Sequence, residues 1–200
     1  MQPLFAQNLP LVGILVASVL LWRVMEAWID IRSFRRLRAG AQRQDSGSKV
    51  VLVCLIALGA LLGVLLALKV PAAAIISGQA VLFWLGIALL YVGIALRLYA
   101  IHTLGAFFTT AVAIAPEQTV IETGPYRLIR HPSYTGFLLA LLGVGLCIFA
   151  NWLSLLVLMG CALIGIGYRI AVEERVLKER LGQPYQDYMR RTKRLIPLVI

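Results

Sequence analysis

The chain alternates long apolar runs with short polar links, and this alternation predicts its elements. Apolar runs at residues 9–28, 50–68, 81–102, 134–149 and 152–171 reach or approach the roughly 18–20 residues that a helix needs to cross a bilayer. No run has the period of two that is typical of membrane strands. We therefore predict an all-α integral membrane protein with about five transmembrane helices. The fourth run is short, and Asn151 is expected to form the polar corner that joins it to the fifth as a helical hairpin.

Composition supports a membrane protein of one domain. Of the 200 residues, 60% are hydrophobic, and the mean hydropathy is +0.87, which is far above the value for a soluble globular protein. We expect a single membrane domain over residues 1–200, in which 1–75 supply N-terminal membrane helices and 80–200 form a core. The N-terminus lacks a basic stretch and a cleavage site, so the first span is expected to be retained.

The basic residues predict the orientation. Nineteen Lys and Arg face nine acids, and most of them lie in the 31–49 link and in the tail after 168. Positive charge favours the cytoplasmic side, so we place 31–49, 103–133 and 172–200 in the cytoplasm and residues 1–8 outside. An odd number of spans is consistent with the placement of all of these segments.

The net charge of +10 does not indicate a nucleic-acid partner. The charges adjoin membrane ends without interleaved aromatic residues, so we interpret them as a topology signal and as contacts to anionic membrane lipids. Cys54, Cys147 and Cys161 lie inside apolar runs without neighbours at metal-ligand spacing, and we expect them to be packing residues. No metal site is predicted.

Two clusters of ionisable residues flank the last pair of apolar runs. The first is the segment 124–134, Gly-Pro-Tyr-Arg-Leu-Ile-Arg-His-Pro-Ser-Tyr, and the second is Arg169-Ile-Ala-Val-Glu-Glu174. Charged groups at the edge of hydrocarbon are costly and usually functional. Because both clusters adjoin the same helical hairpin, we expect them to meet at one membrane face, in a pocket formed by the 103–133 loop and the C-terminal helix.

Pro132 is expected to be the first-turn proline of the fourth span. The backbone N–H groups at that helix start, with Ser133 and Tyr134, would then be available to a ligand carboxylate. His131 is either an interfacial histidine bonded to a loop carbonyl or a ligand contact, and the neighbouring Arg130 favours the second interpretation.

Arg169 and Glu173 are four residues apart and share a helix face, from which Glu174 is turned away. They are either a surface ion pair or ligand contacts, and the position of Arg169 inside the apolar limit favours ligand contacts. In the tail, Tyr185 and Tyr188 are equally consistent with a membrane anchor and with the closure of a pocket.

Three blocks of the sequence resemble the isoprenylcysteine carboxyl methyltransferase family. They are Gly124-x-Tyr-x-x-x-Arg-His-Pro-Ser-Tyr-x-Gly136, Arg169-x-x-x-Glu-Glu174, and Gly182-x-x-Tyr-x-x-Tyr188 with Pro197. The resemblance covers roughly residues 80–200, which makes this core a methyltransferase core. It implies an integral membrane enzyme that uses S-adenosylmethionine from a cytoplasmic pocket and takes a lipophilic acceptor from the bilayer.

The resemblance also implies roles for individual residues. The expected cofactor contacts are Gln118, Thr119, Val120, Ile121, Tyr126, His131, Pro132, Ser133, Tyr134 and Glu173. Arg169 matches an arginine that touches the acceptor, and Arg130 matches a second arginine beside the reaction centre. Gln118 stands where the family usually has a histidine, which retains hydrogen bonding but removes a ring.

The expected chemistry needs positioning more than acid–base catalysis. A carboxylate acceptor is already ionised, so Arg130 and Arg169 could clamp it while Glu173 compensates the charge of the sulfonium. The favoured acceptor is the carboxylate of an S-prenylcysteine or a similar lipid acid. A phenol, enol or thiol stays open as the acceptor, and it would require a base such as His131 or Glu174.

Two other functions stay open. NADPH-dependent sterol reductases share an Arg-His-Pro-x-Tyr-x-Gly motif, but they carry an Asn and an acid where this chain has Ser133 and Phe137. A non-catalytic membrane protein, such as a transporter subunit, would need polar residues in mid-membrane. Arg23, Glu26 and Arg97 are the candidates for such residues, and we expect them near cytoplasmic ends.

Overall fold

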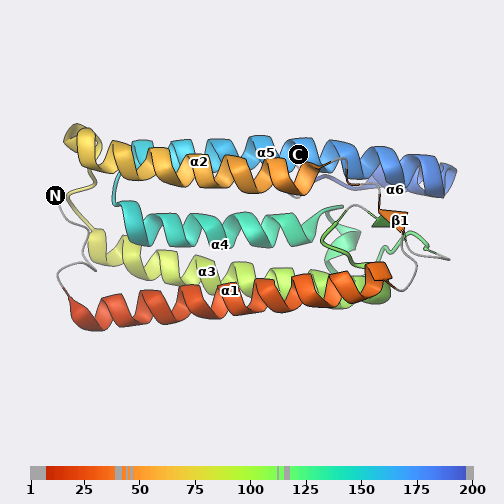
Figure 1. Cartoon of the computed structure of the whole chain (residues 1–200), viewed down its shortest axis with the longest axis horizontal. Helices are drawn as coiled ribbons and strands as arrows, with labels where there is room; N and C mark the ends of the chain where they lie inside the picture. The colour runs from red at the N-terminus through yellow and green to blue at the C-terminus, as the bar shows by residue number, and fades with distance from the viewer. Residues whose placement is uncertain are drawn as a thin grey trace.

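A computed structural model describes residues 8–38, 42–43, 45, 47–111, 113–114 and 118–196. The elements in chain order are α1 (Leu9–Arg38), β1 (Gln42–Arg43), α2 (Ser48–Lys69), η2 (Pro71–Ala73), α3 (Gln79–Leu104), η3 (Gly105–Phe107), β2 (Ala113–Ile114), η4 (Gly124–Arg127), α4 (Pro132–Phe149), α5 (Trp152–Leu181) and α6 (Gln183–Arg191). Within the described ranges, α1 to α5 are long and apolar enough to cross a membrane, so the prediction of five spans in an α-helical membrane fold is confirmed. The five helices lie side by side, and α6, β1 and β2 gather at one end of the bundle (Figure 1).

The first and last spans are longer than their apolar runs. Helix α1 continues to Arg38 and α5 to Leu181, because hydropathy marks the bilayer crossing while a helix continues until its hydrogen bonding is interrupted. At the end of α5, Gly182 has a positive φ of 62°, and its N–H donates to the Lys178 carbonyl. The 31–49 link is helical at both ends, and its short strand β1 pairs with β2 in antiparallel register.

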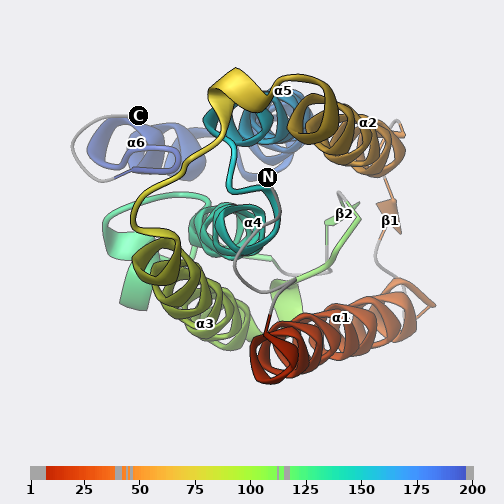
Figure 2. The same cartoon turned by 90° about the vertical axis from the view of Figure 1, so that its left-hand side faces the viewer.

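Helices α3 and α4 approach closely because glycines lie between them. A Cβ atom on Gly93 would lie 2.5 Å from the Ala140 backbone nitrogen, and one on Gly136 would lie 2.7 Å from the Arg97 nitrogen. Small residues allow this approach in a membrane, where association depends on van der Waals packing. Viewed along the bundle, α4 lies near the middle with α3 and α5 beside it, whereas α1 is at the periphery (Figure 2).

The polar corner predicted at Asn151 is confirmed. Its Oδ1 accepts from the Ser154 N–H at 3.1 Å and caps α5, while its Nδ2 donates to the Val70 carbonyl at 3.2 Å. The corner therefore joins α4 to α5 and fixes both to the end of α2.

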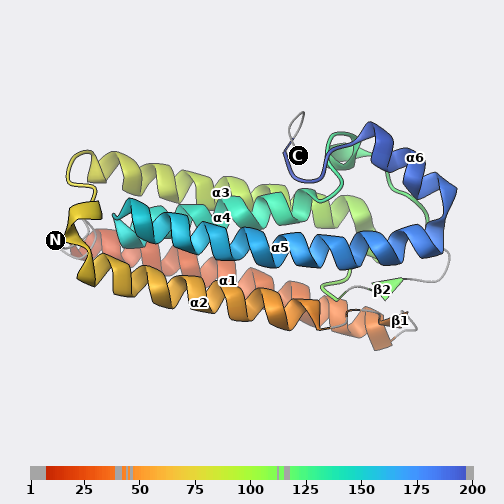
Figure 3. The same ribbon diagram turned by 90° about the horizontal axis from the view of Figure 1, so that it is seen from above.

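At the opposite end, the C-terminal segment folds back over the loop before α4. Ile129 and Lys193 form a parallel bridge, the Arg130 N–H donates to the Lys193 carbonyl at 2.7 Å, and the His131 N–H donates to the Arg194 carbonyl at 3.0 Å. Figure 3 shows α6 at this end of the bundle. These bonds fix the backbone that carries Arg130 and His131.

Candidate active site

A cavity of about 590 Å³ lies at the end of the bundle that carries α6. This volume is typical of a small-molecule site. The cavity has a polar chamber lined by the 118–134 segment, α5 and α6. An apolar part of its lining, here called the apolar arm, comes from α1, α2 and α4 and consists of Trp22, Ala27, Leu52, Val53, Ile56, Ala57, Ala60, Phe137 and Leu141.

Most of the residues predicted for the site line this cavity. They are Gln118, Thr119, Val120, Ile121, Tyr126, Arg130, His131, Ser133, Tyr134, Arg169 and Glu173. Pro132 does not line the cavity. It is fully buried at the first position of α4, where its fixed φ suits a helix start.

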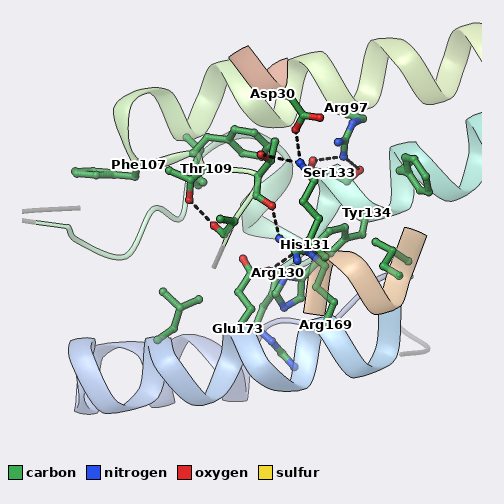
Figure 4. Close-up of a pocket in the computed structure, with 18 of the residues that line it drawn as sticks. Asp30, Arg97, Phe107, Thr109, Arg130, His131, Ser133, Tyr134, Arg169 and Glu173 are labelled. Atoms are coloured by element: carbon green, nitrogen blue, oxygen red, sulfur yellow. Dashed lines mark hydrogen bonds and ion pairs between the residues drawn. The ribbon is translucent and has the colours of Figure 1, made fainter. Parts of the chain in front are cut away.

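A hydrogen-bonded row joins α4 to α5 across the chamber. Arg169 Nε donates to Tyr134 Oη at 2.7 Å, and Tyr134 Oη donates to Glu173 Oε2 at 2.8 Å. Figure 4 shows these three side chains facing one another with His131 beside them. Arg169 and Glu173 are therefore linked through a phenol and are not a surface ion pair. Glu173 forms no ion pair with a described residue, which leaves a partly exposed carboxylate in the wall of the chamber.

Arg169 is more heavily engaged than the predicted acceptor clamp requires. Its Nη1 donates to Asp45 Oδ1 at 3.1 Å and to Ser48 Oγ at 3.0 Å, and its Nη2 donates to the Thr110 carbonyl. Asp45 is buried, so the ion pair is shielded from solvent. Arg169 therefore ties α5 to the start of α2 and to the segment before β2, in addition to contacting Tyr134.

Glu174 holds the other side of the site. It is turned away from Glu173, as predicted, but it is fully buried and not solvated. It accepts from Arg130 Nε at 3.0 Å and from Arg194 Nη2 at 2.9 Å, and His131 Nε2 lies 3.5 Å away. Its hydrogen bonds and charge raise the pKa of Arg194 above the usual arginine value. Arg130 also donates from Nη1 to the Met189 carbonyl at 3.1 Å.

The start of α4 differs in one respect from the prediction. The N–H of Tyr134 donates to the His131 carbonyl at 3.0 Å, and that of Thr135 donates to the same oxygen at 3.2 Å. The Tyr134 N–H is therefore not available to a ligand carboxylate, because His131 already supplies an acceptor. The hydroxyl of Ser133 accepts from Arg97 Nη1 at 2.9 Å.

Three tyrosines close the chamber, which decides between the two interpretations of the tail. Tyr126, Tyr185 and Tyr188 are buried and line the cavity, and Tyr188 Oη donates to the Tyr126 carbonyl at 2.7 Å. Burial, with a smaller contribution from the Glu173 charge, raises the pKa of Tyr126 and Tyr185 well above the usual range. Both are neutral phenols at physiological pH, so they offer ring faces and hydroxyl groups but no base.

Sequence reasoning missed the contribution of the first two helices. Residues 1–75 were expected to supply only additional membrane helices, whereas α1 and α2 line the apolar arm, and Asp45 and Ser48 bind Arg169. Arg97 and Glu26, to which the sequence assigned no role, form an ion pair, and both line the cavity. The sequence feature that could have indicated their role is that Glu26 and Arg97 are charged residues inside apolar runs.

The fold and the site define a multi-pass helical membrane protein with a polar chamber at one end of the bundle and an apolar arm leading from it. Residues 84–179 match the model of the isoprenylcysteine carboxyl methyltransferase (ICMT) family. The match confirms the resemblance to this family that the three sequence blocks carry.

Known relatives agree with the family match. Protein-S-isoprenylcysteine O-methyltransferase B of Arabidopsis thaliana is 34% identical over 57% of this chain and 58% of its own length. Protein-S-isoprenylcysteine O-methyltransferase of Saccharomyces cerevisiae is 33% identical over 58% of this chain and 48% of its own length. A solved structure of the eukaryotic intramembrane Ras methyltransferase ICMT (isoprenylcysteine carboxyl methyltransferase) superposes with a TM-score of 0.58 at 25% identity, covering 74% of this chain and 52% of that one. The chain thus spans about half to three fifths of the length of these relatives.

Proposed function

We propose that this protein transfers a methyl group from S-adenosylmethionine to a lipophilic acceptor at the membrane interface. The favoured acceptor is the carboxylate of an S-prenylcysteine or of a similar lipid acid. The observation that carries the proposal is the single cavity in which the Glu173 carboxylate, without a cationic partner among the described residues, adjoins an apolar arm at membrane depth. A cationic donor and an apolar acceptor can therefore bind side by side.

The chamber fits S-adenosylmethionine in charge and in shape. When bound, this cofactor supplies an electrophilic methyl group on a sulfonium. Glu173 offers the negative charge that a sulfonium or ammonium group requires, and Tyr134 fixes its orientation through Oε2. Tyr126 and Tyr185 offer aromatic faces for an adenine ring or a cation. The 118–121 strip supplies the remaining wall.

The state of Glu174 and of the lining tyrosines favours a carboxylate acceptor. A phenol or thiol would have to lose a proton to a base, but Glu174 already accepts from Arg130 and Arg194 and is a poor proton acceptor. The lining tyrosines are protonated at neutral pH. An acceptor that is ionised before it binds needs no base, so the protein has only to orient it and to exclude water.

The apolar arm provides a place for the lipid part of the acceptor. Its residues lie on the spans of α1, α2 and α4, so a hydrocarbon chain in the arm would remain at membrane depth. The distribution of basic residues supports a chamber that opens to the cytoplasm. Because residues 84–179 match a methyltransferase family, the reductase hypothesis is set aside.

The test is calorimetric titration of the protein in detergent with S-adenosylmethionine and, separately, with NADPH. We expect the protein to bind S-adenosylmethionine and not NADPH. Glu173→Ala should bind S-adenosylmethionine at least tenfold more weakly, since a hydrogen bond to a charged group contributes about 1.5–3 kcal/mol. Glu179→Ala is the matched control, because Glu179 is an exposed acid on the same helix outside the cavity lining. NADPH binding, or equal affinity in Glu173→Ala and wild type, would refute the proposal. Transfer of a labelled methyl group to candidate lipid acids, followed by product mass spectrometry, then identifies the acceptor.

A further inference from the structure

An ion pair lies inside the bundle between two membrane spans. Arg97 Nε in α3 is 2.6 Å from Glu26 Oε1 in α1, and Arg97 Nη2 donates to Glu26 Oε2 at 2.8 Å. The side chains are only 9% and 13% exposed. Trp22 Nε1 also donates to Glu26 Oε1, at 3.3 Å. This is a desolvated ion pair with one hydrogen bond between the charged groups, of the kind that is expensive within a membrane and usually has a function.

The remaining nitrogen of the same guanidinium reaches the start of α4. Arg97 Nη1 donates to the Ser133 carbonyl at 3.1 Å and to Ser133 Oγ at 2.9 Å. Figure 4 shows Arg97 above Ser133, one residue before Tyr134. The rigid plane of a guanidinium thus connects α1, α3 and the first turn of α4.

A purely structural role explains this arrangement poorly. Replacing a buried ion pair by well-packed apolar residues is often neutral or stabilising, so such a pair is weak evidence for stability alone. Here the pair adjoins the site, because Glu26, Arg97 and Ser133 all line the cavity. Glu26 lies outside the stretch that matches the family, whereas Arg97 and Ser133 lie inside it.

We propose that Glu26 and Arg97 are positioning residues for the methyl-donor site. Glu26 fixes the plane of the Arg97 guanidinium, and Arg97 fixes Ser133 and with it the first turn of α4. That turn carries Tyr134, which holds Glu173 through its hydroxyl. Helix α1, a wall of the apolar arm, is thereby coupled to the chamber that binds the donor. This inference rests on the proposed function.

Glu26→Gln tests the coupling, because it keeps the shape of the side chain and removes its charge. We expect the KM for S-adenosylmethionine to rise about tenfold, because the variant loses the charge that strengthens the hydrogen bond between Glu26 and Arg97. The KM for the acceptor should change less than twofold. Asp187→Asn is the control for the change from carboxylate to amide. Its ion pair with Arg190 lies on the surface, with side chains 48% and 75% exposed, and we expect no change in either KM.

The exchange Glu26→Arg with Arg97→Glu separates positioning from stability. The swapped pair can re-form between α1 and α3, but a carboxylate at 97 cannot donate to the Ser133 carbonyl. We therefore expect recovery of most of the thermal stability lost in Glu26→Gln, while the affinity for S-adenosylmethionine stays at least tenfold weakened.

Two results would overturn the inference. One is a normal donor KM in Glu26→Gln, and the other is joint recovery of stability and donor affinity in the exchange variant, which would make the pair merely structural. If the exchange variant does not fold, the KM values of Glu26→Gln decide. The proposed function fails separately, through absence of S-adenosylmethionine binding to the wild-type protein.

Discussion

Arg169 illustrates how one residue can serve the site and the fold together. Replacing it with alanine would remove the Arg169 cation from beside the buried Asp45 carboxylate, and would remove a donor from Tyr134. We expect Arg169→Ala to lower the free energy of unfolding by about 3–5 kcal/mol, the usual effect of breaking a buried ion pair. Arg169→Lys should rescue poorly, because the donors of an ammonium share one nitrogen and cannot reach the separated partners that Nε, Nη1 and Nη2 contact. Thermal unfolding in detergent measures both effects.

The matching control is Arg175→Ala, since Arg175 is an exposed cation on the same helix. The double change Asp45→Asn with Arg169→Met should recover part of the loss, because it leaves no orphan charge in the interior. An Arg169→Ala protein as stable as Arg175→Ala would show that the buried pair contributes nothing.

The buried tyrosines predict an alkaline limit to stability. Burial raises the pKa of Tyr185 above its ordinary value of 10.0, so the folded protein keeps a proton that the unfolded chain releases above this pH. The unfolded state then binds fewer protons, and stability falls as the pH rises above about 10. This group contributes no pH dependence near neutrality. Tyr185→Phe should flatten the decline, as followed by unfolding midpoints between pH 7 and 11, whereas an unchanged slope would contradict the assignment.

The chemistry of the site was predicted in part at the scale of residues. The motifs at 124–134 and 169–174 identified the side chains that line the chamber, because charged groups stand out in an apolar sequence. The partners of those groups were not predicted. Asp45 lies 124 residues before Arg169, and no local pattern indicates that their side chains meet.

At the scale of elements, the contact between α3 and α4 sets the position of the site. A Cβ on Gly93 would lie 2.5 Å from two backbone atoms, which cannot move aside as a side chain can. We expect Gly93→Ala to force the helices apart, to cost about 1–3 kcal/mol through overpacking, and to weaken donor binding by displacing Arg97 from Ser133. Stability and S-adenosylmethionine affinity, measured on one preparation, test both effects.

Gly167→Ala is the control, because nothing lies within 4 Å of a Cβ at that position of α5. It should be neutral, or stabilising by up to roughly 1 kcal/mol, since alanine favours a helix interior. Equal behaviour of the two variants would refute the proposed role of the close α3–α4 contact.

Hydropathy predicted the spanning helices and most of their ends, but not the C-terminal ends of α1 and α5. The starts and ends of α2, α3 and α4 fall within two residues of the apolar runs, because these helices end where the sequence ceases to be apolar. Helices α1 and α5 continue into polar sequence, where hydropathy carries no information. The polar extension of α5 carries Glu173 and Glu174, so the site is built on a helix beyond its apolar run.

At the scale of the whole molecule, orientation is the main untested prediction. The basic segments place the link between α2 and α3 outside and the loop before α4 in the cytoplasm. Cysteine at position 76 should react with a membrane-impermeant maleimide in intact cells, and cysteine at 128 only after permeabilisation. Ile76 and Leu128 are 69% and 63% exposed, so both positions are accessible. Both cysteines are introduced into a variant in which Cys54, Cys147 and Cys161 are replaced by alanine. Labelling at position 128 in intact cells would show that the orientation is the reverse of the predicted one.

The sequence by itself determined the membrane class, the five spans, the resemblance to a family and most of the side chains of the chamber. Each of these depends on local composition or on spacing within one segment. Only the tertiary structure decided that α1 and α2 contribute to the apolar arm, that Asp45 pairs with Arg169, and that Arg97 contacts both Glu26 and Ser133. The reason is physical: helices in a membrane associate through packing of small residues and through isolated polar contacts, and neither leaves a periodic pattern that identifies its partner.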